Sequence, residues 1–413
     1  MLSGRRPDRA PADMETRAPE TESAQTGAPR ATVLVVAGDP SLKLLVSQKF
    51  RREIRENELA FVFADDGASA LRTLGRSDVD VVVTDVQLPG TDGLTLLSDL
   101  KKYFPNIRSV IISAYGDMRT IRRALNLGAF DFLTKPIDLD DLGVTILKTV
   151  EEALALKQAV RDRERLAAIR QELDVARRIQ LSMIPRTFPA FPGRSEFDIY
   201  GDIKTAREVG GDFYDFCILE DDKLYFAIGD ASGKGVPAAL FMAVTRTMIK
   251  AEAIKGNAPD RCLSETNRIL CMENEFSMFI TAFCGILDVG TGEVAYSNGG
   301  HKLPFLVRRG AEVETLPATD GIALGVLEGE SLYHVGTMKL GPGDTIFLYS
   351  DGVTEAANRQ LELYTDKRLE KVLSGIDAGL PKDAVDAVLG DVETFSEGAP
   401  QVDDMALLAI RYN

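Results

Sequence analysis

Histidine and cysteine are scarce in this 413-residue sequence. The two histidines, His301 and His334, are too few for a His-rich metal centre, and any Ser-His-Asp scheme would depend on one of them. The cysteines show no Cys-x-x-Cys spacing, so neither a zinc site nor a disulfide framework is indicated. They are Cys217, Cys262, Cys271 and Cys284. Aspartate must therefore supply the ligands for any metal chemistry.

Long apolar runs are also missing. No segment offers the ~18 consecutive apolar residues of a membrane span, and the N-terminus lacks the apolar core of a signal peptide. These absences predict a cytoplasmic protein without a membrane partner. The net charge of −15 argues against nucleic acid as the main partner, because phosphate backbones are bound by clustered Lys and Arg. A hydrophobic content of 45% and a charged content of 27% describe a soluble globular chain, long enough for two or three domains.

The N-terminal third predicts a tail followed by a parallel sheet. Residues 1–30 are rich in Pro, Arg, Glu and Thr and predict a disordered tail with no assigned role. Residues 31–138 alternate the strand-like segments TVLVV, FVF, VDVVVTD, SVIIS and FDFL with amphipathic helical segments. This alternation predicts a doubly wound, five-stranded parallel sheet. Functional groups are then expected at the carboxyl ends of the strands.

Residues 139–184 predict one long helix. From Leu139 to Met183 there is no proline and only one glycine, Gly143, and the helical pattern stops abruptly at Pro185. Apolar and small residues with 3-4-3-4-3 spacing predict the seam of a short coiled coil, and hence a homodimer. They are Leu166, Ile169, Leu173, Ala176, Gln180 and Met183. The alternative, a solvated helix packed on its own domain, remains open.

Residues 185–413 predict an α+β layered sandwich. Strands such as LYFAIGD, FITAFCGILDV and MALLAIRY are separated by glycine turns, with helical insertions at VPAALFMAVTRTMIKAEAI and around CLSETNRILCM. Four aspartates stand where strands meet turns: Asp212 in VGGDFYD, Asp230 in GDASGKG, Asp351 in YSDGVTE and Asp403 in QVDDMALL. Rigid strand ends can bring carboxylates to one point, where Mg²⁺ or Mn²⁺ takes oxygen ligands. Two such ions about 3.5–4 Å apart can promote an in-line attack on phosphorus.

The strings ARRIQLSMIP, EVGGDFYD, GDASGKGVPAALFM, FITAF, YSNGGHKLP, LGPGD, LYSDGVTEA and DDMALLAIR make this region resemble a metal-dependent protein phosphatase (PPM) of the SpoIIE branch. The resemblance implies a β-sandwich flanked by helices, two Mn²⁺ or Mg²⁺ ions, and hydrolysis of phosphoserine or phosphothreonine. It implies that Asp230 bridges both ions, with help from the Ala231 carbonyl. Asp351 and Asp403 would complete the shell of the second ion. Asp212 would serve the first ion directly or through water.

This sequence departs from the wider family at several positions. Ser232 stands where relatives have a proton-donating histidine, and His301 stands where they have the aspartate of a third metal. A third ion is therefore not implied. Asp404 is expected to be structural. Arg207 could contact the phosphate, although a surface arginine is the favoured interpretation.

Three other functions were weighed against these motifs. GGDFYD is similar to the GGDEF motif of diguanylate cyclases, but Phe213 replaces the glutamate, and the SDG and DDMALL strings would remain unexplained. GDASGKG is not a P-loop, because only three residues separate Gly229 from Gly233, and Gly235 stands where Ser or Thr is required. The third alternative is a non-catalytic module that sequesters a partner. Retention of all four aspartates argues against it.

The segment VVVTDVQLPGTDG makes residues 31–138 resemble a response-regulator receiver domain. The resemblance implies that Asp85 accepts a phosphoryl group with Mg²⁺, that Ser113 and Lys135 read it out, and that Phe132 is the switching aromatic. A sensor kinase or an adaptor would be the partner in two-component signalling.

The acid pair that normally helps a receiver to bind Mg²⁺ is missing from this sequence. VLVVAGDP has Ala37 and Gly38 in its place, and Asp39 is predicted to be a helix N-cap before Pro40. We expect weak Mg²⁺ binding and slow or absent phosphorylation at Asp85. Taken together, the sequence predicts a receiver-regulated serine/threonine phosphatase. Its implied substrate is a phosphorylated, STAS-like anti-sigma-factor antagonist.

Overall fold

The computed structural model describes residues 28–90, 92–114, 117–272, 274–309, 313–329, 331–376 and 379–413. The predicted tail lies outside these residues up to residue 27. The chain divides into two compact units, residues 1–166 and 167–413. In the described part of the chain, no helix combines the length and the apolar character needed to cross a bilayer.

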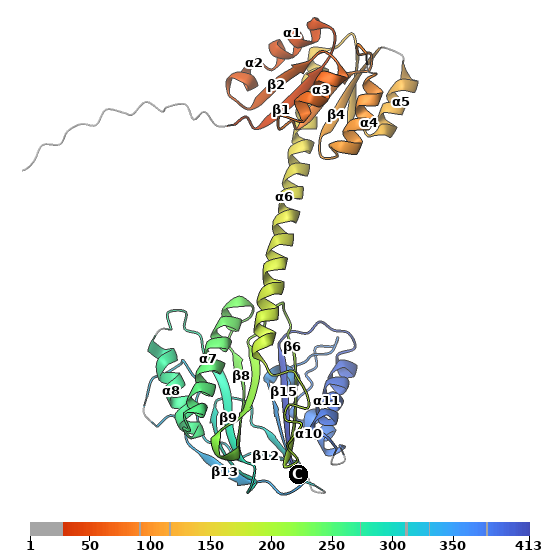
Figure 1. The fold of residues 1–413 in the computed structure, drawn as a ribbon. Helices are drawn as coiled ribbons and strands as arrows, with labels where there is room; N and C mark the ends of the chain where they lie inside the picture. Colours follow the sequence, from red (N-terminus) through yellow and green to blue (C-terminus); the bar gives the residue numbers. More distant parts are fainter. Residues whose placement is uncertain are drawn as a thin grey trace, which may run out of the picture. The chain divides into compact units, whose positions relative to one another are not determined.

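The first unit contains the predicted parallel sheet, with strand order β2-β1-β3-β4-β5 (Figure 1). Its elements are β1 (Ala31–Val36), α1 (Pro40–Lys49), α2 (Arg51–Arg55), β2 (Leu59–Ala64), α3 (Gly67–Leu74), β3 (Val81–Asp85), α4 (Gly93–Tyr103), β4 (Arg108–Ala114), α5 (Met118–Leu127) and β5 (Asp131–Lys135).

Both faces of this sheet are buried, as its almost continuous apolar strands predict. Along β1, Val33 and Val35 face a core that includes α1 and the first turns of α6 (Leu139–Met183). Leu34 and Val36 face the opposite core, which α3, α4 and α5 complete. The doubly wound fold expected for this part of the chain is therefore confirmed.

Helix α6 spans Leu139–Met183, the residues between which the sequence predicts a single helix. Leu166 and Ile169 of the predicted seam are exposed, with 58% and 43% of their surface accessible. Gln180 differs from them, because it is buried against its own chain. Its amide donates from Nε2 to the Gly210 carbonyl at 2.6 Å, and its Oε1 accepts from the Gly210 N–H at 3.1 Å. Gln180 is thus not available to a second helix, and the coiled coil stays a prediction.

The second unit is a sandwich of two five-stranded sheets, with strand orders β13-β10-β9-β8-β7 and β12-β11-β14-β15-β6. The strands are β6 (Phe197–Lys204), β7 (Asp212–Ile218), β8 (Lys223–Ala231), β9 (Ile280–Asp288), β10 (Glu293–Gly299), β11 (Phe305–Val307), β12 (Val313–Thr315), β13 (Gly336–Lys339), β14 (Thr345–Tyr349) and β15 (Met405–Tyr412). The helices are α7 (Val236–Ile254), α8 (Pro259–Met272), α9 (Asp351–Thr354), α10 (Asp366–Ser374) and α11 (Pro381–Ser396).

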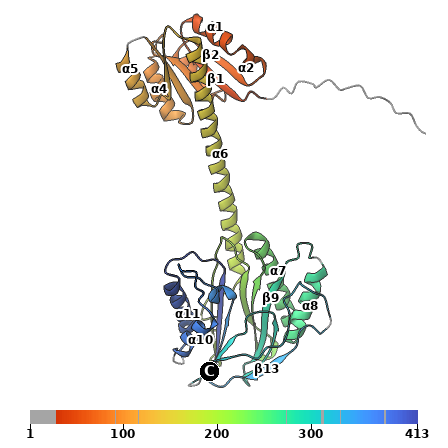
Figure 2. The ribbon, with the colours of Figure 1, turned by 180° about the vertical axis from the view of Figure 1, so that it is seen from behind.

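Helices cover the two outer faces of this sandwich, as Figure 2 shows from behind. Helices α7 and α8 pack on the sheet that contains β8 and β9, whereas α10 and α11 pack on the sheet that contains β14 and β15. Alternation along β14 separates the two cores, since Ile346 and Leu348 face the other sheet while Phe347 and Tyr349 face the helices. The predicted layered sandwich is confirmed, although the sequence analysis did not identify α10 and α11.

Candidate functional site

The four predicted aspartates lie at one edge of the sandwich and come from both sheets. Asp212 begins β7 and is paired directly with Asp230 near the end of β8 in the antiparallel register. Asp351 begins α9, directly after β14 and Ser350, and Asp403 lies two residues before β15. The charges of Asp351 and Asp403 both act on Asp230, so the structure brings the four side chains together.

These carboxylates repel one another in a poorly hydrated place. Burial and then the charge of Asp230 raise the pKa of Asp212 well above its ordinary value. Burial and then the charge of Asp351 raise the pKa of Asp230 to about 7. Like charges placed directly opposite across two strands destabilise a sheet, so the Asp212–Asp230 pair has a cost that packing does not explain. A bound cation would offset it.

The donor set fits a hard divalent cation. One buried oxygen of Asp212, Oδ2, has no hydrogen-bond partner in the described part of the chain. The Ala231 carbonyl follows Asp230 at the end of β8 and adds a neutral oxygen close by. Carboxylate and carbonyl oxygens are the ligands that Mg²⁺ and Mn²⁺ prefer. However, the described residues contain no set of three or more His, Cys, Asp or Glu side chains already arranged to hold a metal ion.

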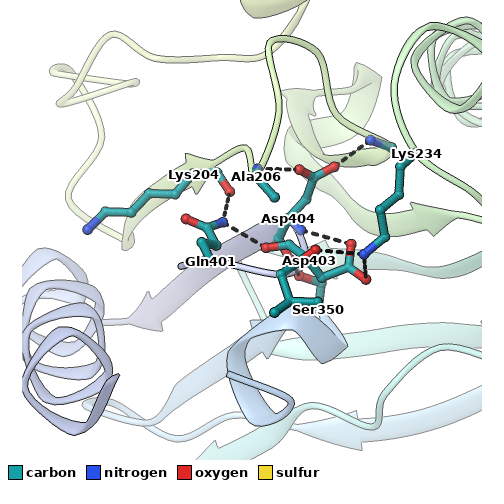
Figure 3. A network of polar contacts seen from close by, with 9 residues as sticks. Lys204, Ala206, Lys234, Ser350, Gln401, Asp403 and Asp404 are labelled. Carbon is teal, nitrogen blue, oxygen red and sulfur yellow. Dashed lines mark hydrogen bonds and ion pairs between the residues drawn. The ribbon is translucent and has the colours of Figure 1, made fainter. Parts of the chain in front are cut away.

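Asp404 organises the backbone around this site. Its carboxylate accepts hydrogen bonds from the Ala206 N–H at 2.7 Å and the Gly211 N–H at 2.6 Å (Figure 3). A Cβ on Gly210 would lie 2.4 Å from Asp404 Oδ2, and a Cβ on Gly352 would lie 1.8 Å from its carbonyl oxygen. Gly210 is therefore required for the close approach of the two sheets, and Gly352 for the close approach of neighbouring segments within one sheet. These contacts agree with the structural role expected for Asp404.

Ser350 links the two strands that carry Asp351 and Asp403. Its N–H donates to the Ala406 carbonyl at 3.0 Å, and its Oγ accepts from the Ala406 N–H at 2.9 Å. The hydroxyl also donates to the Asp404 carbonyl at 3.5 Å, and its presence near Asp212 partly offsets the rise in the pKa of that carboxyl. The sequence analysis missed this residue, although its position directly before the SDG aspartate was an available signal.

Ser232, His301 and Arg207 have the following surroundings. The Ser232 hydroxyl accepts from the Phe279 N–H at 2.9 Å. His301 is buried, its Nδ1 lies 2.8 Å from Thr281 Oγ1, and burial lowers its pKa to about 4. His301 is therefore neutral at physiological pH. Arg207 is exposed, with Nη1 3.9 Å from the place that a Cβ on Gly235 would take.

The predicted receiver residues gather at the carboxyl edge of the first sheet. Asp85 ends β3 and is buried, and its Oδ2 is ion-paired with Lys135 Nζ at the end of β5. Ser113, near the end of β4, is buried, and its Oγ has no hydrogen-bond partner among the described residues. Phe132 lies on β5 and packs, half-buried, against the core under α4 and α5.

The residues at the positions of the missing acid pair do not replace it. Ala37 is part of the core, and a Cβ on Gly38 would lie 3.0 Å from Pro89 Cγ. Asp39 is the N-cap of α1, because its Oδ1 accepts from the Ser41 N–H at 2.8 Å. The N-cap prediction is confirmed, and Lys135 is the cation that faces Asp85.

The pKa shift of Asp230 predicts how the stability of the metal-free protein depends on pH. An acid with a raised folded-state pKa binds its proton more tightly in the folded state, so the free energy of unfolding falls as the pH rises from about 4 to about 7. We expect Asp230→Asn to flatten this dependence and to raise the free energy of unfolding at pH 8 by roughly 1–4 kcal/mol. Thermal unfolding in EDTA between pH 4 and pH 8 measures both effects. Asp221→Asn, which changes an exposed carboxylate of the same unit, is the control, and equal curves for the two variants would contradict the expectation.

Comparison with known proteins identifies two domains in this chain. A family model for the response regulator receiver domain matches residues 33–147, and a model for stage II sporulation protein E (SpoIIE) matches residues 220–413. Protein IcfG of Synechocystis sp. is 26% identical over 327 residues, which are 72% of this chain and 51% of that protein. Phosphoserine phosphatase RsbU of Bacillus subtilis is 27% identical over 210 residues, which are 50% of this chain and 61% of that protein.

The chain thus spans between half and two thirds of the length of these curated relatives. Among solved structures, the SiaA-PP2C domain of Pseudomonas aeruginosa superimposes with a TM-score of 0.53 at 23% identity. The match covers 60% of this chain and 98% of that domain, and it shows the fold of the C-terminal region. The chain contains a receiver domain, residues 33–147, followed by a SpoIIE-type domain of the PPM family, residues 220–413.

Proposed function

We propose that this chain is a metal-dependent protein phosphatase that hydrolyses phosphoserine or phosphothreonine under the control of its receiver domain. The observation that carries the proposal is the group of Asp212, Asp230, Asp351 and Asp403 at one sandwich edge, with Asp212 Oδ2 buried and unpartnered. The relative RsbU is named a phosphoserine phosphatase, which agrees with this activity.

In this proposal the chain's own residues hold two Mn²⁺ or Mg²⁺ ions and orient the phosphate. Asp230 would be a ligand of both ions, and the Ala231 carbonyl would help to hold one of them. Asp351 and Asp403 would hold the second ion, and Asp212 would serve the first. When bound, such ions activate water and stabilise the charge that develops in an in-line attack on phosphorus. His301 is neutral and therefore not the obvious proton donor, and the Ser232 hydroxyl accepts a hydrogen bond and keeps its own proton. A water molecule at the site would then protonate the leaving serine or threonine oxygen.

The proposed substrate is a phosphorylated, STAS-like anti-sigma-factor antagonist in a partner-switching pathway. This assignment rests on the likeness to RsbU and to the SpoIIE family. A sensor kinase or an adaptor is the proposed partner of the receiver domain. A homodimer through α6 is proposed from the exposed seam residues Leu166 and Ile169.

Hydrolysis of p-nitrophenyl phosphate tests the proposed activity. We expect the full chain to hydrolyse this compound when Mn²⁺ is supplied and to stop when EDTA removes the metal. Asp230→Asn should lower the rate by at least about 100-fold, the size of losing one preorganised electrostatic contact in an active site. Asp221→Asn is the control with an unchanged site. Metal-dependent binding of the protein without any hydrolysis would favour the sequestering module instead.

The receiver site generates a second prediction. Because Lys135 neutralises Asp85 and the acid pair is absent, we expect no stoichiometric phosphoryl transfer to Asp85 from acetyl phosphate with Mg²⁺. Intact-mass spectrometry of the full chain after incubation measures the transfer. Rapid uptake of one phosphoryl group that Asp85→Asn abolishes would sink this idea.

The contact between α6 and the catalytic domain generates a third prediction. Gln180→Ala would leave the buried N–H and carbonyl of Gly210 unpaired, which costs about 1–3 kcal/mol next to the Asp212 turn. We expect a severalfold change in turnover at saturating Mn²⁺, whereas Arg177→Ala on the exposed face of the same helix should leave turnover unchanged. Removal of residues 1–150 should also change turnover. Equal turnover in all these proteins would refute regulation through the helix.

A further inference from the structure

Lys234 forms an ion pair with one of the four aspartates, and the proposed mechanism does not use it. Lys302 is a second cation near the group, since its charge acts on Asp351. Lys234 lies in the loop between β8 and α7, four residues after Asp230. Its Nζ is 2.8 Å from Asp403 Oδ2 and 2.6 Å from the Val402 carbonyl oxygen (Figure 3). The loop lacks the spacing of a P-loop, and no role for Lys234 was predicted from the sequence.

Asp403 is satisfied by the chain itself. Its Oδ1 accepts from the Asp404 N–H at 3.0 Å, and its Oδ2 is paired with Lys234. Its carbonyl accepts from Gln401 Nε2 at 2.7 Å. Asp212 is in the opposite condition, with an oxygen that has no partner among the described residues. Asp212 thus has a carboxylate oxygen available for a metal ion, whereas both carboxylate oxygens of Asp403 already have partners within the chain.

We propose that Lys234 competes with the divalent ion that Asp403 would bind, and so sets the affinity of the second metal position. This inference rests on the proposed function. The ammonium group and a divalent ion need the same carboxylate oxygen, and like charges at that distance repel each other. Binding of the second ion therefore includes the loss of the Lys234–Asp403 ion pair. Lys234 is a positioning residue in this scheme, since it acts through Asp403.

The ion pair distinguishes the two proposed metal positions from each other. Because Lys234 pairs with Asp403, one of the four aspartates already has a cationic partner within the chain. The first position, around Asp212 and Asp230, contains no such competing cation in the contacts of the described residues.

Lys204 provides a matched control in the same domain. Its Nζ also forms an ion pair, with Glu393, and its side chain is 36% exposed against 34% for Lys234. Removal of either lysine makes the chain, with its net charge of −15, more negative by one charge. A general effect of charge on cation binding would therefore appear in the variants of both lysines. A competition at Asp403 would appear only in the variant of Lys234.

Isothermal titration of the EDTA-stripped full chain with MnCl₂ tests the inference. We expect Lys234→Met to tighten the weakest resolved Mn²⁺ site about tenfold, the size of one unit charge removed beside a partly buried ion. Lys204→Met should stay within about twofold of the wild type, and Lys234→Arg should bind like the wild type because it keeps the charge. Lys234→Gln replaces Lys234→Met if circular dichroism shows the latter to be unfolded.

The outcomes separate this inference from the proposed function. Binding by Lys234→Met that is no tighter than binding by Lys204→Met overturns the competition, whatever the activity. If the wild type binds Mn²⁺ and hydrolyses p-nitrophenyl phosphate in that case, the phosphatase proposal stands alone. A wild type that binds no Mn²⁺ and hydrolyses nothing overturns both.

Discussion

Repulsion between carboxylates that share a poorly hydrated edge is the constraint on which the SpoIIE-type domain depends. Asp212 and Asp230 face each other across two strands of one sheet, and Asp351 and Asp403 come from the other sheet. Such a group would move apart if its backbone could relax. Asp404 holds the Asp212 turn, and Gly210 admits Asp404 of the second sheet at a distance that no Cβ would tolerate. The hydrogen bonds and close contacts around the site therefore maintain a charge arrangement that needs a cation.

The two units differ in how the charge of their aspartates is balanced. In the receiver domain, a lysine at the end of β5 neutralises the buried aspartate Asp85, and the acids that would attract a metal are absent. In the SpoIIE-type domain, Lys234 forms an ion pair with one aspartate of four, and a buried oxygen of Asp212 has no partner in the described part of the chain. A site with a permanent internal counter-ion is stable without ligand. A site with an incomplete one gains stability when a cation arrives.

The sequence predicted the features that depend on local pattern. The long helix from Leu139 to Met183, the strands of both units and the N-cap role of Asp39 follow from periodicity, missing proline and capping chemistry. The four aspartates were recognisable because each follows or precedes a strand at a glycine turn. Their surroundings were not, because the partners of Asp403 and Gly210 come from distant segments or from residues with no local signal. Gln180 illustrates the limit of prediction from sequence. Its spacing fits the seam of a coiled coil as well as it fits the intramolecular contact that the structure contains.

The contact of Gln180 with Gly210 depends on the register of helix α6. Its amide gives one donor and one acceptor to the same peptide unit, Gly210, so both bonds depend on one side-chain orientation. One residue of slip along an α-helix moves a side chain by about 1.5 Å and turns it by about 100°. Neither bond survives such a step, and no partial slip preserves one of them at full strength. The contact between α6 and the turn before Asp212 therefore forms in one register of the helix and is lost in the neighbouring ones.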